Sequence, residues 1–207
     1  MWVKICGLTR PSDVEHAAAQ GPDALGFVLA ASPRQLTPER ARALLAHVPE
    51  GLCTVAVFRG LDAEQLATCR QLGFDLVQFH GPPPAPMRRA TLDGTDPRGG
   101  CSWLPAFVDG PDLGDRLAAA TPGAVLVDGP LGGGRGILAD PARVARHAVG
   151  RTLVLAGGLN PDNVGQAIEG VGPFGVDVCS GVEATPGIKD PARVAAFVAA
   201  ARQAEAR

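Results

Sequence analysis

Two side chains that can transfer protons follow apolar runs in the two halves of the chain. Cys6 closes the run 2–6 with Gly7 behind it, and Asp128 comes directly after the run 124–127. A thiol at the end of a buried strand is more often a small core side chain, and a carboxyl group there is ordinary as a loop cap. Both groups also suit general acid–base catalysis if their pKa values lie near neutrality. The two residues alone leave both interpretations open.

Two glycine-rich stretches follow the last two apolar runs. The first contains Gly157 and Gly158, and the second contains Ser180 and Gly181. Turns of this composition expose backbone N–H groups, and in α/β barrels they often bind phosphate after strands seven and eight. Tight turns alone would explain one such stretch. Two at neighbouring strands favour a phosphate site.

An arginine and a histidine occupy two further run ends. Arg34 follows Ser32 and Pro33, where its planar guanidinium could hold a substrate carboxylate by two parallel hydrogen bonds, although a solvated arginine is the common case. His80 is the one histidine at a run end, and the other three fall in segments of helical period. The sequence therefore predicts no histidine-rich metal site.

The elements that must position these side chains alternate along the chain. Apolar runs cover 2–6, 24–29, 53–58, 76–79, 103–108, 124–127, 153–156 and 174–178. They are continuous, as in parallel strands whose two faces are both covered. Helices are predicted over 12–20, 38–48, 63–72, 112–120, 141–148, 161–169 and 191–204. Four of them begin with a capping residue followed by proline, at Thr37-Pro38, Asp140-Pro141, Asn160-Pro161 and Asp190-Pro191.

Eight strand–helix units predict an α/β protein with a closed (β/α)8 TIM barrel, formed by residues 1–207 as a single domain. The segment 81–102 is so rich in proline and glycine that the fourth helix is expected to be weak or missing. An open doubly wound sheet is the alternative, but no G-x-G-x-x-G follows the first strand. In a closed barrel the carboxyl ends of the strands meet at one mouth, which would gather the residues named above.

Composition excludes several classes of protein. A formal net charge of −2 with scattered Lys and Arg argues against binding to nucleic acid or to an anionic membrane. The first residues lack the apolar length of a signal peptide or a membrane span, so we expect a cytoplasmic protein. The 5 cysteines are odd in number and form no C-x-x-C pair, which predicts reduced thiols and no structural zinc.

Five stretches of the sequence carry a resemblance to a known family. They read VKICGLTRPSD at 3–13, ALGFVLAASPR at 24–34, DLVQFHG at 75–81, LVLAGGLNPDNV at 153–164 and GVDVCSGVEATPGIKD at 175–190. In combination they resemble phosphoribosylanthranilate isomerase, the family that performs an Amadori rearrangement in tryptophan biosynthesis. The similarity runs from the first strand to the last helix.

The resemblance implies a role for each candidate residue. Cys6 would be the general base and Asp128 the general acid, and Arg34 would hold the anthranilate carboxylate. His80 would belong to the pocket wall and Asp177 would lie close to the site. The phosphate would bind to Gly157, Gly158, Ser180 and Gly181. The reaction implied is the isomerisation of a small phosphosugar without cofactor or metal, by a monomer or a homodimer.

Three differences from the family pattern and two alternatives accompany this interpretation. Pro82-Pro83-Pro84 stands where the family often has an acidic residue, the family's strand-five lysine is missing from 103–107, and the loop after Asp128 reads Gly133-Gly134-Arg135-Gly136. A histidine-pathway or dual-substrate isomerase would perform the same reaction, but the histidine-pathway family has an aspartate in place of Cys6. A non-catalytic phosphosugar-binding barrel would need neither a thiol nor an acid.

Overall fold

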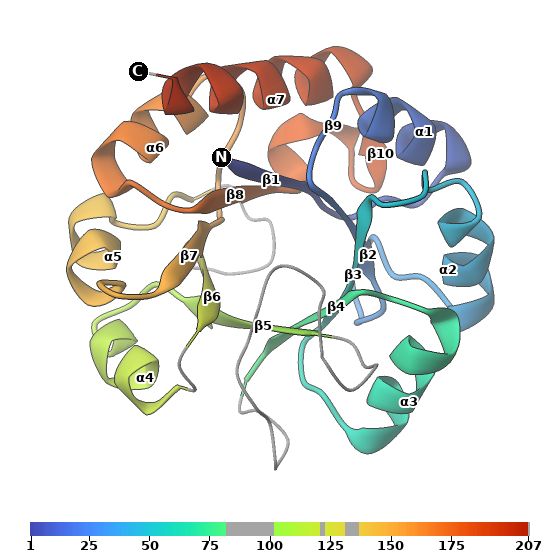
Figure 1. Cartoon of the computed structure of the whole chain (residues 1–207), viewed down its shortest axis with the longest axis horizontal. Coiled ribbons are helices and arrows are strands. Elements are labelled where there is room, and N and C mark those ends of the chain that lie inside the picture. Colours follow the sequence, from blue (N-terminus) through green and yellow to red (C-terminus); the bar gives the residue numbers. More distant parts are fainter. Residues whose placement is uncertain (82–101, 121–122, 131–136, 207) are drawn as a thin grey trace.

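A closed barrel of eight parallel strands forms the centre of the molecule (Figure 1). The computed structural model describes residues 1–81, 102–120, 123–130 and 137–206. The strands follow one another around the barrel in chain order, and β8 pairs with β1. They are β1 (Trp2–Ile5), β2 (Ala24–Val28), β3 (Cys53–Phe58), β4 (Leu76–His80), β5 (Ser102–Val108), β6 (Ala124–Asp128), β7 (Thr152–Leu155) and β8 (Gly175–Val178). The predicted fold is confirmed, and each predicted strand differs by at most one residue at either end.

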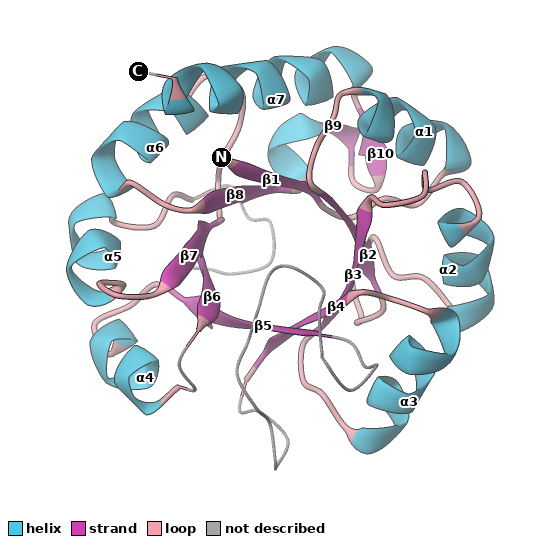
Figure 2. Ribbon diagram, viewed as in Figure 1, coloured by secondary structure: helices cyan, strands magenta, loops and turns pink. Residues whose placement is uncertain are grey.

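Helices surround this barrel as an outer ring (Figure 2). They are α1 (Pro11–Ala19), α2 (Pro38–Leu45), α3 (Ala63–Leu72), α4 (Leu113–Ala119), α5 (Pro141–His147), α6 (Val164–Val171) and α7 (Pro191–Glu205). Because helices cover the outside of the sheet and side chains fill its inside, most strands are buried on both faces. In β5 only the inward face is buried, and the outward residues are half-buried. The predicted weak fourth helix, the run of prolines at 82–84 and the glycine loop at 133–136 lie outside the described residues.

Three of the four predicted helix starts are confirmed by side-chain caps. Thr37 accepts a hydrogen bond from the backbone N–H of Arg40. Asp140 and Asp190 each accept two backbone hydrogen bonds from the first turn that follows. Each cap satisfies N–H groups that have no partner within the helix.

The fourth predicted start, at Asn160-Pro161, is wrong. Asn160 Oδ1 accepts hydrogen bonds from the backbone N–H groups of Asp162 at 2.8 Å and Asn163 at 3.2 Å. These bonds close a turn in place of a helical cap, and α6 begins only at Val164. Asparagine stabilises such local turns as readily as it caps helices.

Alternate residues of each strand point into the barrel, and most of them are apolar. One interior cluster consists of Leu104, Ala106, Ala124, Leu126, Val154 and Ala156. A second contains Cys6, Ala24, Val55, Val57 and Leu76. The same alternation turns the last inward residue of each strand toward the mouth, and this places the candidate site.

Three short elements after β8 were not predicted. The 3-10 helix η1 (Ser180–Val182) is followed by the antiparallel pair β9 (Glu183–Thr185) and β10 (Ile188–Lys189).

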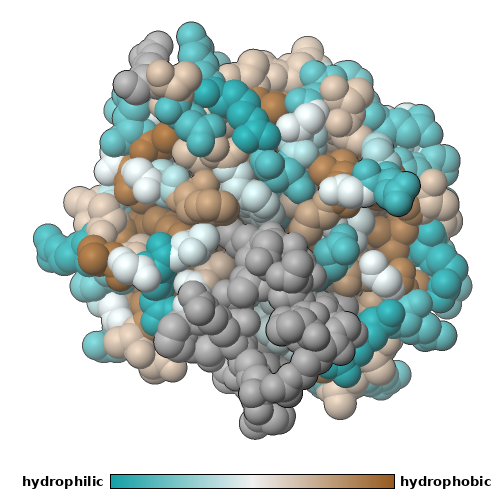
Figure 3. Space-filling view, viewed as in Figure 1, coloured by the Kyte–Doolittle hydropathy of each residue, from teal (hydrophilic) through white to brown (hydrophobic). Residues whose placement is uncertain are grey.

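On the face seen in Figure 3, hydrophilic residues lie around much of the rim. No helix within the described part of the chain combines the length and the apolar character needed to cross a membrane.

Candidate active site

A cavity of about 350 Å³ lies at the carboxyl ends of the strands. Eight of the nine predicted site residues line it, namely Cys6, Arg34, His80, Asp128, Gly157, Gly158, Asp177 and Ser180. The ninth, Gly181, lines a separate recess with Asn160 and Arg193. The sequence therefore placed most of the candidate residues around one space.

Cys6 lies one residue beyond β1 and is 5% exposed. Its backbone N–H donates to the carbonyl of Val178 at 2.8 Å, so it continues the pairing of β1 with β8. A hydrogen bond with Cys179 lowers the pKa of the Cys6 thiol to about 7; burial opposes this shift, and the nearby Lys4 ammonium supports it. A thiol with this pKa is substantially ionised at neutral pH and suits a general base.

Asp128 ends β6 and is 7% exposed. Three steps around the barrel separate β6 from β1, so the two side chains reach the cavity from different walls. Asp128 Oδ1 accepts a hydrogen bond from the backbone N–H of Gly129 at 2.9 Å. A β-carbon at Gly157 would lie 2.6 Å from this oxygen, so the turn after β7 packs directly against the carboxyl group.

The turn after β7 has the conformation of an anion-binding loop. Gly157 and Gly158 have φ values of 82° and 66°, a left-handed pair that favours glycine. The backbone N–H groups of Gly157, Gly158 and Ser180 donate to no other described residue. Free N–H groups on adjacent turns suit a phosphate. In the turn after β8, packing requires a glycine at position 181, because a β-carbon at Gly181 would lie 1.9 Å from the carbonyl oxygen of Leu159.

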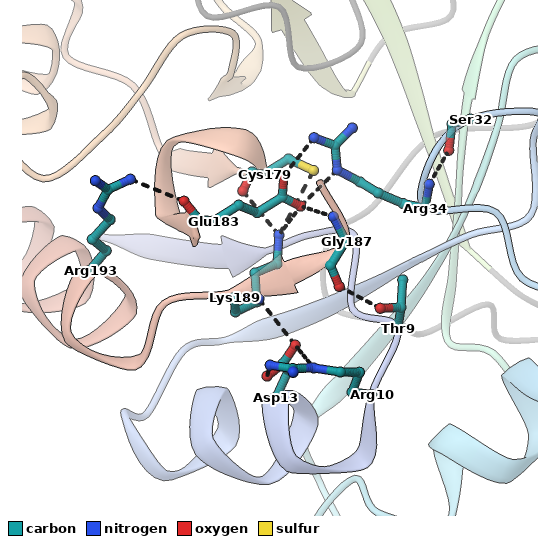
Figure 4. A network of polar contacts seen from close by, with 10 residues as sticks. All are labelled: Thr9, Arg10, Asp13, Ser32, Arg34, Cys179, Glu183, Gly187, Lys189 and Arg193. Atoms are coloured by element: carbon teal, nitrogen blue, oxygen red, sulfur yellow. Dashed lines mark hydrogen bonds and ion pairs between the residues drawn. The ribbon is translucent and has the colours of Figure 1, made fainter. Parts of the chain in front are cut away.

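Arg34 is 8% exposed and does form a two-bond pair, but with a residue of the protein. Its Nε donates to Glu183 Oε1 at 2.7 Å and its Nη2 donates to Glu183 Oε2 at 2.6 Å (Figure 4). This pairing raises the pKa of the Arg34 guanidinium against the effect of burial. Nη1 donates to no described residue, so the outer end of the guanidinium faces the cavity with free donors.

Glu183 and Lys189 complete this network, and the sequence interpretation missed both. Lys189 Nζ donates to Glu183 Oε1 at 2.9 Å and to the carbonyl oxygen of Cys179 at 3.0 Å. The backbone N–H of Lys189 donates to Asp13 Oδ2 at 3.1 Å, which joins β10 to α1 (Figure 4). The available signal was the pair of opposite charges flanking the Thr-Pro-Gly stretch at 185–187.

A second buried network lies inside the barrel below the cavity. Lys4 is fully buried; its Nζ lies 2.9 Å from Asp177 Oδ2 and donates to Gln78 Oε1 at 2.9 Å. Burial alone would lower the pKa of Lys4, but Asp177 and Cys6 outweigh it and the pKa is raised. Asp177 Oδ1 is buried and has no partner among the described residues. A buried oxygen of this kind at a cavity wall is suited to accept a hydrogen bond from a ligand.

His80 ends β4 and lines the cavity. Burial lowers its pKa, and the neighbouring Asp128 only partly offsets this, so the imidazole is neutral at neutral pH. A further strand-end acid, Asp109, turns away from the site. Its Oδ1 accepts from Arg143 Nε at 2.8 Å and its Oδ2 accepts from the backbone N–H of Asp140 at 2.8 Å, so it ties β5 to the start of α5.

Comparison with known proteins decides the family. Residues 3–200 match the family model described as N-(5'phosphoribosyl)anthranilate (PRA) isomerase. The chain belongs to the phosphoribosylanthranilate isomerase family. It is an isomerase of the aldose–ketose class in tryptophan biosynthesis, as predicted. The histidine-pathway isomerase and the non-catalytic barrel are not favoured.

Curated relatives agree over nearly the whole chain. The N-(5'-phosphoribosyl)anthranilate isomerase of Pseudomonas aeruginosa is 42% identical over 211 residues, covering 97% of this chain and 94% of the relative. The enzyme of the same name from Syntrophus aciditrophicus is 40% identical over 214 residues, covering 97% of this chain and 87% of the relative.

Solved structures share the fold. The phosphoribosyl anthranilate isomerase of Thermotoga maritima superposes with a TM-score of 0.83 at 33% identity, covering 98% of this chain and 99% of that one. A phosphoribosyl anthranilate isomerase in complex with reduced 1-(o-carboxyphenylamino)-1-deoxyribulose 5-phosphate gives a TM-score of 0.80 at 32% identity, with the same coverage.

Proposed function

We propose that this protein converts N-(5'-phosphoribosyl)anthranilate to 1-(2-carboxyphenylamino)-1-deoxyribulose 5-phosphate, with Cys6 as general base and Asp128 as general acid. One observation carries the assignment of roles. The thiol and the carboxyl group reach a single cavity from strands three steps apart, and the glycine turn after β7 lines the same cavity. Acid–base isomerisation needs two such groups on different sides of the sugar.

The proposed chemistry moves one proton in and one proton out. The Asp128 carboxyl group protonates the furanose ring oxygen, and the ring opens to an iminium that acidifies the C2′ proton. The Cys6 thiolate removes that proton, and the enolamine formed tautomerises to the ketone. Each group is expected to contribute roughly 10²–10⁴-fold to the rate.

The two charged ends of the substrate would bind different groups of the cavity wall. The phosphate would accept hydrogen bonds from the free N–H groups of Gly157, Gly158 and Ser180. Gly181 belongs to the same turn as Ser180. The anthranilate carboxylate would bind the outer end of Arg34, because Glu183 occupies the other edge of the guanidinium. This leaves Asp177 Oδ1 to accept a hydrogen bond from a sugar hydroxyl, and His80 to wall the pocket.

The setting of this activity is also a proposal. We expect residues 1–207 to work as one domain in the cytoplasm, with a small phosphosugar as the only partner that catalysis requires. Monomer and homodimer both stay open. The Thermotoga maritima relative is described as dimeric, with monomeric forms generated from it.

Single substitutions test the two catalytic roles. We expect C6A and D128N each to lower kcat by about 10²–10⁴-fold while the affinity for a reduced product analogue stays near that of the wild type. Fluorescence of the anthranilate substrate gives the rate, and titration calorimetry gives the affinity. C53A and D112N are matched controls, since Cys53 begins β3 and Asp112 is exposed beside α4. A near-normal kcat for C6A or D128N removes that residue from the mechanism.

A further inference from the structure

Two thiols lie side by side where β1 and β8 end. Ile5 pairs with Val178 across these strands, so Cys6 and Cys179 occupy the next facing positions. Their side chains pack in one cluster, and both cysteines are free. Two glycines make space for the sulfur atoms. A β-carbon at Gly7 would lie 2.7 Å from Cys179 Sγ, and one at Gly26 would lie 2.7 Å from Cys6 Sγ.

The charges around the pair distinguish its two members. The groups that face Cys6 are Cys179 and Asp177 from β8 and its end, Lys4 from β1, Lys189 from β10 and Arg34 from the loop after β2. Lys189 Nζ lies 3.0 Å from the carbonyl oxygen of Cys179 and 4.0 Å from its Sγ. The buried Lys4 ammonium is the cation that contributes most to ionisation of Cys6.

Only one of the two thiols can ionise readily. The pKa of Cys179 is raised well above its ordinary value, because its hydrogen bond with Cys6 favours the protonated form and burial adds to this. A second thiolate beside the first would place two negative charges in contact. Cys6 is therefore the member of the pair that ionises as the pH rises through neutrality, and the Cys179 thiol is the donor.

We propose that Cys179 is a positioning residue of this isomerase: its S–H donates a hydrogen bond to the Cys6 sulfur and keeps that sulfur ionised toward the cavity. The inference rests on the proposed role of Cys6 as the general base. Cys179 acts on the reaction only through Cys6. The competing explanation is that Cys179 simply fills space beside Gly7.

The pH dependence of Cys6 reactivity separates these explanations. Alkylation of Cys6 by iodoacetamide is followed across pH by peptide mapping in the wild type, C179S and C179A. We expect a wild-type midpoint at a pH of about 7. C179A should raise the midpoint by about one pH unit, since a hydrogen bond to a charged group is lost. C179S keeps a donor in the same place and should return the midpoint most of the way.

Two results would overturn the inference. One is a C179A midpoint equal to that of the folded wild type, which would make Cys179 a space filler. The other is a C179S midpoint displaced as far as that of C179A, which would exclude the donated hydrogen bond. The acid limb of kcat/KM, recorded for the same three proteins, should move in parallel with alkylation.

The test distinguishes its own failure from failure of the proposed function, because alkylation requires no turnover. A C6A variant with normal kcat, together with a displaced midpoint in C179A, would refute the catalytic role and keep the thiol pair. Should C179A fail to fold, ultraviolet thiolate absorbance of the wild type and C6S provides a second measurement. A thiolate that titrates near neutral pH in the wild type and is lost in C6S supports the pair, and its absence from the wild type refutes it.

Discussion

Glu183 holds Arg34 by two hydrogen bonds of 2.7 and 2.6 Å, although the residues lie 149 positions apart in the chain. Lys189 donates to the same carboxylate at 2.9 Å. The guanidinium is therefore fixed before substrate arrives, and the outer donors of Arg34 meet an incoming carboxylate without loss of side-chain freedom. The charge balance of this network is one carboxylate between two buried cations.

The first prediction concerns that carboxylate. E183Q leaves Arg34 and Lys189 buried without a counter-charge, so we expect the free energy of unfolding to fall by about 3–5 kcal/mol. KM should rise about tenfold, since loss of roughly 1.4 kcal/mol of binding follows from a misplaced Arg34, and kcat should change little. Denaturant unfolding and steady-state kinetics measure the two effects. E50Q, at an exposed glutamate, is the control.

The ion pairs of Glu183 also predict how the stability difference between wild type and E183Q depends on pH. Burial raises the pKa of Glu183, but Arg34 and Lys189 outweigh it and the net pKa is lowered. A carboxyl group with a lowered folded-state pKa stabilises the fold above its unfolded-state value and loses this contribution as the pH falls through the folded-state value. The stability gap between wild type and E183Q should therefore narrow in acid. A gap that is constant from neutral to acid pH would contradict the ionic interpretation.

The sequence predicted the strands well because their signal is local. A continuous apolar run such as 53–58 is buried on both faces whatever its neighbours are, and β3 has those bounds. The start of α6 was wrong because the Asn160 side chain can cap a turn or a helix with the same oxygen. Local composition does not distinguish these two uses.

The charged networks could not be predicted for a different reason. Lys4 reads as one polar residue within an apolar strand, and only the closed barrel brings it to Asp177 and Gln78. Arg34 has a free guanidinium in the sequence interpretation and a paired one in the fold. Strand parity places side chains at the mouth, but contacts over long sequence separation decide which donors are already occupied.

Gly157 provides the second prediction. A β-carbon there would lie 2.0 Å from Gly129 N and 2.6 Å from Asp128 Oδ1, at a φ of +82°. G157A should cost about 1–2 kcal/mol for the backbone conformation and about 1–3 kcal/mol for the close contacts. Displacement of Asp128 should also lower kcat by at least about tenfold.

A second glycine serves as the matched control. Gly165 lies in α6, and a β-carbon there meets nothing within 4 Å. G165A should leave kcat unchanged and stabilise the helix by about 0.5–1 kcal/mol. Thermal unfolding and kcat, measured for G157A and G165A, test both expected effects. Equal stability of both variants would show that the turn after β7 does not press against Asp128.

The third prediction concerns the buried pair of Lys4 and Asp177. K4M leaves the Asp177 carboxylate buried beside an apolar side chain, and D177N leaves the Lys4 ammonium without its counter-charge. Each should destabilise the protein by about 3–5 kcal/mol. The double variant K4M/D177N buries no charge there, so its cost should be well below the sum of the two. Additive costs would mean that the pair does not interact.

Loss of Lys4 should also change the pKa of the neighbouring Cys6 thiol. The Lys4 ammonium helps to lower the pKa of Cys6. The midpoint for alkylation of Cys6 should therefore rise in K4M, and the double variant should show whether removal of the Asp177 charge offsets it. Peptide mapping across pH provides the measurement. An unchanged midpoint in K4M would show that the Lys4 charge does not contribute to ionisation of Cys6.

The last prediction uses oxidation to test the contact between the two sulfur atoms. Neighbouring strands hold facing residues about 4.8 Å apart, which is within the roughly 4.4–6.8 Å range of disulfide Cα separations. With hydrogen peroxide, the Cys6 thiolate should attack an oxygen to give a sulfenic acid and release hydroxide. The Cys179 thiol should then displace that oxygen as water and form the S–S bond, so one peroxide accepts two electrons.

Activity should be lost during this oxidation and recovered with dithiothreitol, and mass spectrometry should find the Cys6 and Cys179 peptides joined. In C179S the thiol that faces Cys6 is gone, so Cys6 should proceed to sulfinic acid and recovery should fail. Cys53 is an internal control, since burial raises its pKa to about 12 and leaves it protonated. Equal recovery of wild type and C179S, with no linked peptide, would show that the sulfur atoms do not meet, because a sulfenic acid beside a thiol is captured faster than it is oxidised further.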